Sequence, residues 1–329
     1  MIIYILQRIR KLFKSIGKKE EIINDLILYL NFKKNFNNQN FIDHDFSPDT
    51  EVEEPIKIAA AITFFYDERK LPTLFKVCKS LDEISNQNEI YIFTNKISTA
   101  QQIELKNGLK NNIQIIVINE VLNNRLLPWY HLDLMRKIYD KKDVTHFIYL
   151  EDDILIEKSN FRYWVNSRKF LKQINLIPGF VRTELNKKNN EIYAVDFVKK
   201  IKLNNLPKIT INDNYYLVNN KFPYQGMYLY DRELMKEHLD GPSSNPDCGH
   251  GAYDTNYLDR RMINLDLMAK ANIGLTYLNY PQGFHNRSVV LYNRKEKKID
   301  NNCQIKHLSN KYSNLNSMFG NVKVKNAIS

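Results

Sequence analysis

Cysteine is scarce in this chain, and its cysteines are not spaced for metal binding or redox chemistry. Three of the 329 residues are cysteines, Cys78, Cys248 and Cys303, and no two of them form a C-x-x-C pair. Neither a zinc site nor a dithiol redox centre is therefore predicted. The odd number and wide spacing of the cysteines favour a reducing, cytoplasmic compartment.

The chain also lacks an apolar run long enough to cross a bilayer, because its apolar start, MIIYIL, is interrupted by Gln7 and Arg8. Residues 1–19 are instead patterned as a helix with one apolar and one basic face. The apolar face holds Ile2, Ile5, Leu6, Ile9, Phe13 and Ile16, and the basic face holds Arg8, Arg10, Lys11, Lys14 and Lys18. Such a helix either binds an anionic membrane surface, peripherally at the inner face of the cytoplasmic membrane, or packs on the protein's own body or on a second copy.

Glycine-rich phosphate loops are missing as well. No G-x-G-x-x-G segment and no Walker lysine loop occurs, so neither a common dinucleotide fold nor a P-loop ATPase is indicated. The net charge of +11 comes mostly from scattered lysines in an Asn-, Lys- and Ile-rich composition, which a low-GC genome would also produce. Without a recognisable binding motif, no nucleic-acid partner is expected.

What the sequence does contain is a regular alternation of apolar strand-type runs and helical patterns. Strands are predicted at 57–65, 89–96, 112–121 and 147–150, with helical segments between them. This order predicts an α/β fold, with a mostly parallel mixed sheet covered by helices on both faces and an N-terminal helical extension. The expected divisions are a helical region 1–34, a linker 35–55, a main domain 56–295 with halves 56–155 and 156–295, and a polar tail 296–329 that is either an ordered wrap near the site or a loose end.

The most informative motif is an acidic triplet directly after an apolar strand. Glu151, Asp152 and Asp153 follow the strand-type run FIYL. Adjacent carboxylates repel one another, and acidic residues are poor strand formers, so a triplet at the mouth of a sheet indicates a divalent cation and, through it, a phosphate. The alternative is that one of the three caps the next helix or forms a surface salt bridge.

The triplet resembles the D-x-D motif of nucleotide-sugar-dependent glycosyltransferases of the GT-A fold. More narrowly, YLEDDILIEKSNFRYW is similar to the acidic segment of the β-1,2-N-acetylglucosaminyltransferase I family, and PYQGMYLYDRELM followed by GAYDTNYLDRR is similar to that family's later order. The matched order spans roughly residues 57–262. The chain departs from the Golgi members of that family, since it has neither their membrane anchor nor their disulfides.

The resemblance implies a role for each acid of the triplet. Asp153 would contact an Mn²⁺ or Mg²⁺ ion that bridges the donor diphosphate, Asp152 would reach the metal through water or hold the ribose, and Glu151 would orient the other two or contact the nucleoside. His285 is expected as a further metal ligand or diphosphate contact, with His307 as the other candidate; each could equally be structural.

Further donor contacts are expected from two segments. Tyr66, Asp67 and Arg69 follow the first strand, where the base of a nucleotide usually docks in this fold, although a simple strand-to-helix turn would look the same. The guanidinium of Arg287 suits a phosphate, although it could equally be a surface arginine.

An inverting transferase also needs a general base. Asp254 is the predicted base because it lies after a glycine-rich turn at the start of a helix, with Asp247 and Asp259 as alternatives; a helix N-cap is the competing role. The segment Tyr224–Gln225–Gly226 is expected to line the acceptor pocket. Trp129–Tyr130–His131, and the pair Tyr228 and Tyr230, are expected to pack in the core or at helix starts.

These features together predict a metal-dependent glycosyltransferase, hexosyl or N-acetylhexosaminyl, that uses a nucleotide-sugar donor, with a UDP-sugar expected. The acceptor would be a glycan or a lipid-linked glycan, in bacterial surface polysaccharide or lipopolysaccharide synthesis. Two alternatives stay open: a metal-dependent nucleotidyltransferase, and a non-catalytic membrane-attached assembly protein with a degenerate transferase fold.

Overall fold

A computed structural model describes residues 17–36, 42–53, 55–109, 113–121, 124–246, 265–314 and 318–329. Its central sheet has five strands in the order β11-β4-β1-β2-β3. The strands are β1 (Lys57–Phe64), β2 (Gln87–Asn95), β3 (Ile113–Ile118), β4 (His146–Glu151) and β11 (Met227–Asp231). The first four are parallel, and β11 is antiparallel to β4. The predicted α/β class and mostly parallel mixed sheet are therefore confirmed.

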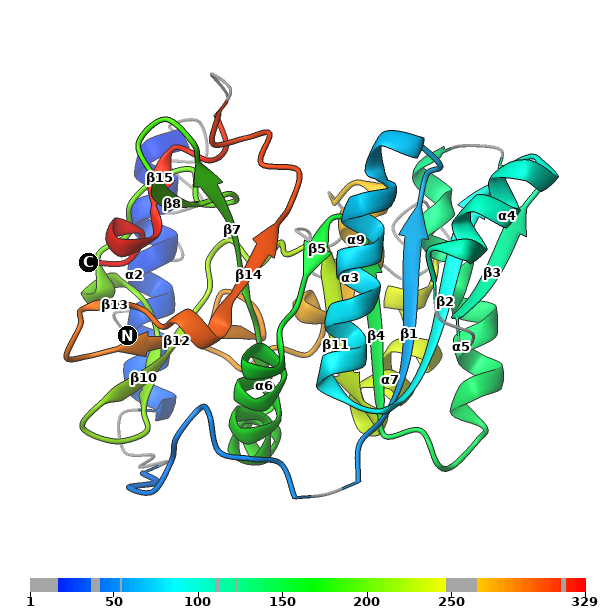
Figure 1. The fold of residues 1–329 in the computed structure, drawn as a ribbon. Coiled ribbons are helices and arrows are strands. Elements are labelled where there is room, and N and C mark those ends of the chain that lie inside the picture. Colours follow the sequence, from blue (N-terminus) through cyan, green and yellow to red (C-terminus); the bar gives the residue numbers. More distant parts are fainter. Residues whose placement is uncertain are drawn as a thin grey trace.

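Helices cover both faces of this sheet (Figure 1). Helix α3 (Leu71–Ile84) contacts β2, and it buries Leu74, Val77 and Leu81 as their spacing predicts. On the other face, α5 (His131–Tyr139) contacts β1, and α7 (Arg232–Asp240) contacts β4 and β11. Helix α4 (Thr99–Asn107) connects β2 to β3 and begins with a capping box.

The second half of the chain adds two smaller five-stranded sheets and the helices α6 (Lys158–Leu171) and α9 (Leu267–Ile273). One sheet contains β6 (Ile177–Pro178), β9 (Lys208–Thr210), β10 (Tyr215–Asn219), β12 (Ser288–Asn293) and β13 (Lys298–Ile299). The other has the order β15-β8-β7-β14-β5 and contains β5 (Ile154–Leu155), β7 (Val181–Asn186), β8 (Glu191–Ala194), β14 (Gln304–His307) and β15 (Val322–Lys323). Two strands of this sheet, β14 and β15, come from the tail, so the described part of the tail is an ordered wrap.

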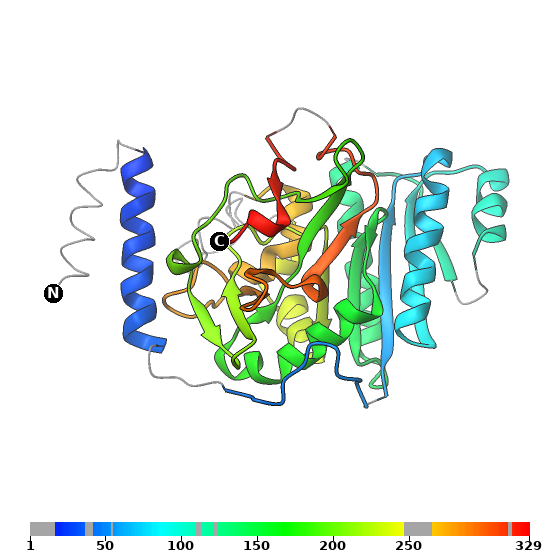
Figure 2. The ribbon, with the colours of Figure 1, turned by 60° about the vertical axis from the view of Figure 1, so that its left-hand side comes forward.

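The N-terminal extension is a helix, α2 (Gly17–Phe36), which lies along one side of the body (Figure 2). Near its C-terminal end, Phe32 and Phe36 pack on Phe284 with ring centroids 5.6 and 5.0 Å apart. Residues 1–16 of the predicted membrane helix lie outside the described residues. No described helix is long and apolar enough to span a bilayer.

The segment predicted as a linker is docked on the body over residues 42–53. Phe46 is buried, and its ring packs edge-on against Phe170 and Tyr215. The backbone N–H of Asp43 donates to the carbonyl of Ile211. This part of the segment therefore follows a fixed path across the second half of the chain.

The predicted core residues behind the sheet are confirmed by their burial. His131 is buried, and its two ring nitrogens lie 2.5 Å from the Pro128 carbonyl and 2.7 Å from the Tyr228 hydroxyl. Trp129 and Tyr230 are also buried, and the rings of Tyr228 and Tyr230 stack 4.3 Å apart. These side chains pack helix α5 onto the sheet.

Acid should destabilise the protein through its buried histidines. Burial lowers the pKa of His131 to about 4 and that of His238 to about 3, whereas a histidine in an unfolded chain has a pKa of about 6.5. Because the folded pKa is the lower one, the unfolded state binds more protons below pH 6.5, and stability is lost as the pH falls from about 6.5 toward 4. We expect the free energy of unfolding, measured by urea titration, to fall by roughly 3 kcal/mol across this window through His131 alone.

The variant His131→Gln should flatten this pH dependence, although it lowers stability at neutral pH. His44→Gln is the matched control, because His44 is exposed, and it should leave the pH dependence unchanged. Equal slopes for wild type and H131Q would contradict the prediction.

Candidate active site

The acidic triplet lies at the point where the order of the central sheet reverses. From β1 the chain proceeds outward to β2 and β3, and then returns to β4 on the other side of β1. Ligands of open α/β sheets bind at the carboxyl ends of the strands beside such a switch point. Here the loop after β1 and the triplet after β4 meet: the Lys70 Nζ lies 3.0 Å from Asp152 Oδ2.

The two aspartates of the triplet have different pKa values, because their neighbours differ. Burial, together with the charge of Asp153, raises the pKa of Asp152 to about 6 although Lys70 opposes this shift. Burial alone would also raise the pKa of Asp153, but the hydrogen bond and charge of His307 outweigh it and lower that pKa to about 2. Asp153 therefore has the lower pKa of the two aspartates, and His307 from the tail is the cause.

His307 connects the triplet to a third carboxylate. It ends strand β14, which pairs antiparallel with β5 in the register His307↔Ile154. Its Nε2 lies 3.1 Å from Asp153 Oδ2, and its Nδ1 lies 2.5 Å from Glu184 Oε1. Although burial opposes the charged form, the hydrogen bonds to Asp153 and Glu184 raise the pKa of His307 above its usual value.

Glu151 is held differently, by neutral donors on the far side of the triplet. The Tyr224 hydroxyl donates to Glu151 Oε1 at 2.6 Å, and the Asn272 side-chain amide donates to the same oxygen at 3.1 Å. Gly226 has a φ of 67°, and a Cβ on it would lie 3.0 Å from Ile154 Cγ1 and 3.1 Å from Glu151 Oε2. Only glycine combines this conformation with such close contact.

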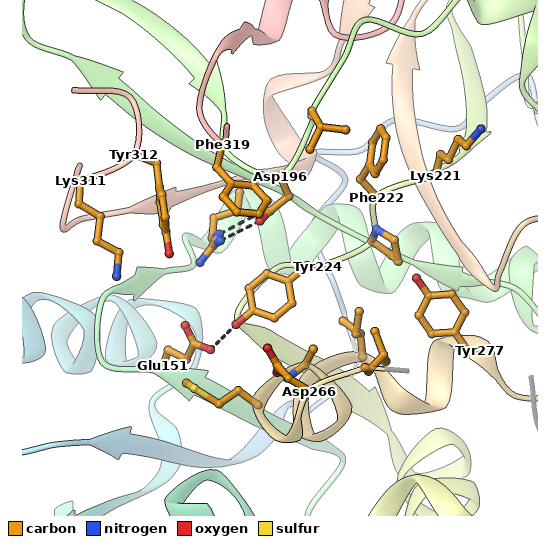
Figure 3. Close-up of a pocket in the computed structure, with 17 residues that line it drawn as sticks. Glu151, Asp196, Lys221, Phe222, Tyr224, Asp266, Tyr277, Lys311, Tyr312 and Phe319 are labelled. Atoms are coloured by element: carbon orange, nitrogen blue, oxygen red, sulfur yellow. Dashed lines mark hydrogen bonds and ion pairs between the residues drawn. The ribbon is translucent and has the colours of Figure 1, made fainter. Parts of the chain in front are cut away.

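A cavity of about 570 Å³ opens beside Glu151 (Figure 3). Aromatic side chains dominate its wall, and they are Phe222, Tyr224, Tyr277, Tyr312 and Phe319. Leu265, Asp266, Met268 and Ala269 line it from the start of helix α9 and the segment before it. The Asp266 carboxylate caps that helix by accepting from Ala269 N at 2.8 Å.

A buried ion pair forms part of the same wall. Arg182, on β7, makes two hydrogen bonds to Asp196, at 3.1 and 2.8 Å. Its guanidinium also faces two rings, with centroids 4.8 Å away for Tyr224 and 5.5 Å away for Tyr312. Tyr312 in turn stacks on His307 at 5.5 Å. Arg182 therefore contacts both the side chain that holds Glu151 and the ring beside His307.

No motif in the sequence marks Arg182, Glu184, Lys70 or Tyr312. Arg182 and Glu184 lie on β7, and nothing in the sequence says which residues of a strand in the second half face the triplet. Lys70 follows directly on the predicted nucleotide loop Tyr66–Arg69, and this position was the one signal in the sequence that it lies near the site. The Tyr224–Gly226 segment does line the cavity through Tyr224, whereas the Gln225 amide bonds the backbone of Phe180 and Met227.

The predicted nucleotide loop is close to the triplet through Lys70, but its own side chains are engaged locally. The Tyr66 hydroxyl donates to Glu104 at 2.8 Å. Asp67 caps the 3₁₀ turn Glu68–Lys70 and pairs with Arg69 at 2.7 Å. Their roles toward a donor stay predictions.

Two other predicted residues lie in the second half of the chain. Arg287 is 1% exposed, and both carboxylate oxygens of Glu237 lie 2.8 Å from its Nη1; Asn175 accepts from its other nitrogens. Arg287 therefore forms a buried ion pair within the fold, and its role toward a phosphate stays a prediction. His285 is buried beside Asn219, which accepts its backbone N–H at 2.6 Å, whereas it is His307 that reaches Asp153.

Asp254, with the alternatives Asp247 and Asp259, lies outside the described residues, so its predicted role as general base stays a prediction. Within the described ranges, no group of three or more His, Cys, Asp or Glu side chains is arranged as a ready metal site. The described carboxylates that line the cavity are Glu151, Asp196 and Asp266.

No protein-family model matches the sequence, and no curated protein matches it. Among solved structures, the mannosyltransferase PcManGT from Pyrobaculum calidifontis, in complex with GDP-Man and Mn²⁺, has a TM-score of 0.39 and 9% identity, covering 75% of this chain and 65% of that one. The galactosyltransferase LgtC, in complex with donor and acceptor sugar analogs, has a TM-score of 0.34 and 14% identity, covering 66% and 70%.

A third solved structure, 4-diphosphocytidyl-2C-methyl-D-erythritol synthase from Anaerococcus prevotii, has a TM-score of 0.31 and 10% identity, covering 57% of this chain and 77% of that one. Similarities this low carry no functional argument. The narrower resemblance to the β-1,2-N-acetylglucosaminyltransferase I family stays a prediction, and function has to be argued from the geometry of the chain itself.

The pair Arg182–Asp196 should behave as one buried unit. Arg182→Met leaves the Asp196 carboxylate buried without its cation, and we expect the free energy of unfolding to fall by about 3 kcal/mol. In the double variant Arg182→Met/Asp196→Asn no charge is left unpaired, so most of that loss should be recovered. Urea unfolding of the two single variants and the double variant measures this, and a double-variant loss equal to the sum of the single losses would contradict it.

Proposed function

We propose that this protein is a metal-dependent glycosyltransferase of the GT-A type, which moves a hexosyl or N-acetylhexosaminyl group from a nucleotide-sugar to a glycan or lipid-linked acceptor. One observation carries the proposal: an acidic triplet at the switch point of an α/β sheet opens directly onto an aromatic-lined cavity. A donor diphosphate needs the first feature, and a sugar acceptor suits the second. Synthesis of a bacterial surface polysaccharide or lipopolysaccharide is the proposed setting.

The donor would bind along the edge formed by the loops after β1 and β4. Lys70 is about half exposed there, and its ammonium group lies at the triplet, so it can meet a phosphate while it holds Asp152. The exposed guanidinium of Arg69 is one residue away. A UDP-sugar is the donor that we propose, with the base docked on the Tyr66–Arg69 loop.

The residues around Asp153 fit a divalent cation. Carboxylate oxygens are the ligands that Mg²⁺ and Mn²⁺ prefer, and the Asp153 Oδ2 and His307 Nε2 atoms lie 3.1 Å apart. Histidine ligands commonly donate their other ring N–H to a carboxylate, which is the place of Glu184 here. Asp153 and His307 would therefore hold Mn²⁺ or Mg²⁺, with Glu184 fixing the imidazole.

When bound, such a cation would stabilise the negative charge of the departing nucleoside diphosphate. The protein's own residues would orient the reactants. Glu151 faces the cavity with one oxygen fixed by Tyr224 and Asn272, so it can accept a hydrogen bond from a sugar hydroxyl. The rings of Phe222, Tyr312 and Phe319 offer flat apolar surfaces to the carbon faces of a sugar. Asp254 remains the proposed general base.

A second candidate, a metal-dependent nucleotidyltransferase, is favoured by one feature. Such enzymes need a cation near the first strand to hold the phosphates of a nucleoside triphosphate, and Lys70 occupies that place. The absence of glycine from the segment Tyr66–Pro72 speaks against it, because the backbone of that loop is not free to wrap around phosphates.

Calorimetric titration of UDP, GDP and CMP, with and without Mn²⁺, tests the proposal. We expect one nucleotide to bind only when Mn²⁺ is present, and we expect Asp153→Asn and His307→Gln each to abolish that dependence. Glu184→Gln should weaken the metal-dependent binding by at least about ten-fold, because it removes the partner that orients the imidazole.

His285→Gln is the matched control, since it changes the other candidate histidine in the same way. If it abolishes the metal dependence while His307→Gln does not, His285 is the ligand that the sequence first indicated. If no nucleotide binds with metal, the protein is the non-catalytic assembly protein. Release of pyrophosphate from a nucleoside triphosphate and a sugar phosphate would establish the nucleotidyltransferase instead.

A further inference from the structure

Exposed apolar side chains gather at one end of the molecule. Of the nine large hydrophobic residues that are exposed in the described ranges, five lie on strands β7 and β8 or on segments next to them. These five are Leu185, Ile192, Val198, Met318 and Phe319, with exposed fractions between 37 and 67%. Exposed apolar side chains that cluster in this way indicate an interaction surface, whereas single scattered ones do not.

Backbone contacts hold these segments together. Leu185 and Ile192 are cross-strand partners in the β7–β8 ladder, so their side chains share one face. The Asn310 side chain accepts from Leu185 N at 3.1 Å, and Gly320 N donates to Val195 O at 2.9 Å, which ties the tail to both strands. Strands β7, β8 and β15 lie together at the top left of Figure 1. We call this surface the hairpin–tail surface.

The charges on this surface are almost all positive. Residues 185–202 contain five lysines and two acids, and residues 308–329 contain three lysines and no acid. Both acids are already paired within the protein: Asp196 with Arg182, and Glu191 with Lys323 and Lys325. The two segments together therefore contain eight lysines and two acids.

The hairpin–tail surface continues into the cavity of the proposed active site. Val198 and Phe319 belong to both, since they are exposed and also line the cavity. Lys221 and Lys311 also line the cavity, and in Figure 3 they lie on either side of Phe319. A flat partner bound to the surface would thus lie at the cavity's rim.

We propose that the hairpin–tail surface docks on an anionic lipid bilayer and that the acceptor is lipid-linked, its glycan entering the cavity from that bilayer. The second clause rests on the proposed function. Apolar side chains interspersed with lysines suit the boundary between headgroups and acyl chains, where the chains insert and the lysines meet anionic headgroups. This surface is separate from residues 1–19, and it would orient the cavity toward the membrane, which a terminal helix alone cannot do.

The test places a reporter on the surface of the full-length chain. An environment-sensitive fluorophore (NBD) is attached at Met318→Cys in a Cys248→Ser background, because Cys78 and Cys303 are buried. Ile103→Cys is the matched control, since Ile103 is 54% exposed and Met318 67%, and Ile103 lies on α4, a helix of the central sheet. The probe at 318, but not at 103, should shift to the blue and brighten at least about two-fold with vesicles of phosphatidylglycerol and phosphatidylcholine.

Charge variants supply a second measurement. Lys187→Ala/Lys200→Ala should weaken vesicle binding by about five-fold per lysine, whereas Lys106→Ala/Lys137→Ala, exposed lysines on α4 and α5, should leave it unchanged. A protein that sediments with vesicles while the probe at 318 stays in water would overturn the proposal, and so would an absence of vesicle binding. If the probe responds to soluble polyglutamate but not to vesicles, the partner of this surface is an acidic protein and not a bilayer. Metal-dependent nucleotide binding is measured separately. If it is present while vesicle binding is absent, the membrane proposal fails and the transferase proposal does not.

Discussion

Three consecutive carboxylates at the end of one strand repel one another, and much of the molecule is arranged around holding them in place. Each carboxylate is tied to a different part of the chain. Lys70, from the loop after β1, holds Asp152; His307, from the tail, holds Asp153; and neutral donors from the second half hold Glu151. Like charges this close are tolerated only where cations or hydrogen-bond donors converge on them. The triplet therefore requires the loop, the second half and the tail to meet at one edge of the sheet.

The sequence alone was enough for the class of fold and for the position of the acidic triplet at the carboxyl end of a strand. The strands are short apolar runs, and their pattern and length indicate strands and not helices. Acids directly after such a run lie at the carboxyl end of the strand. The partners of the triplet were not predictable, because they are 73 to 154 positions away along the chain, and pairing over such distances is decided by tertiary packing. The choice between His285 and His307 shows the limit. Both lie in the second half without a motif that distinguishes them, and only the pairing of β14 with β5 brings one of them to Asp153.

The tail shows how a polar, asparagine-rich segment becomes part of a site. It contributes few apolar side chains of its own, yet Ile305, Val322, Val324 and Ile328 are buried, and β14 inserts between β7 and β5. Asparagine side chains in this region bond backbone groups, as Asn310 does at Leu185. Composition suggests a loose end here because it measures average polarity, whereas a strand inserted in a sheet needs only alternate residues to be apolar.

The two ends of the triplet are chemically distinct, and the difference matches what a sugar transfer requires. Asp152 is paired with Lys70 and Asp153 with His307, so a ligand that brings its own positive charge suits this end better than an uncharged one. Glu151 accepts from a hydroxyl and an amide, so it can gain a further hydroxyl without losing an ion pair. Under the proposed function, a cation that carries a diphosphate would therefore be directed to the aspartate end, and an uncharged sugar hydroxyl to the glutamate end. Of the three acids, Glu151 is the one that lines the aromatic cavity, so under the proposed function the order of the acids along the strand would set the order of donor and acceptor across the site.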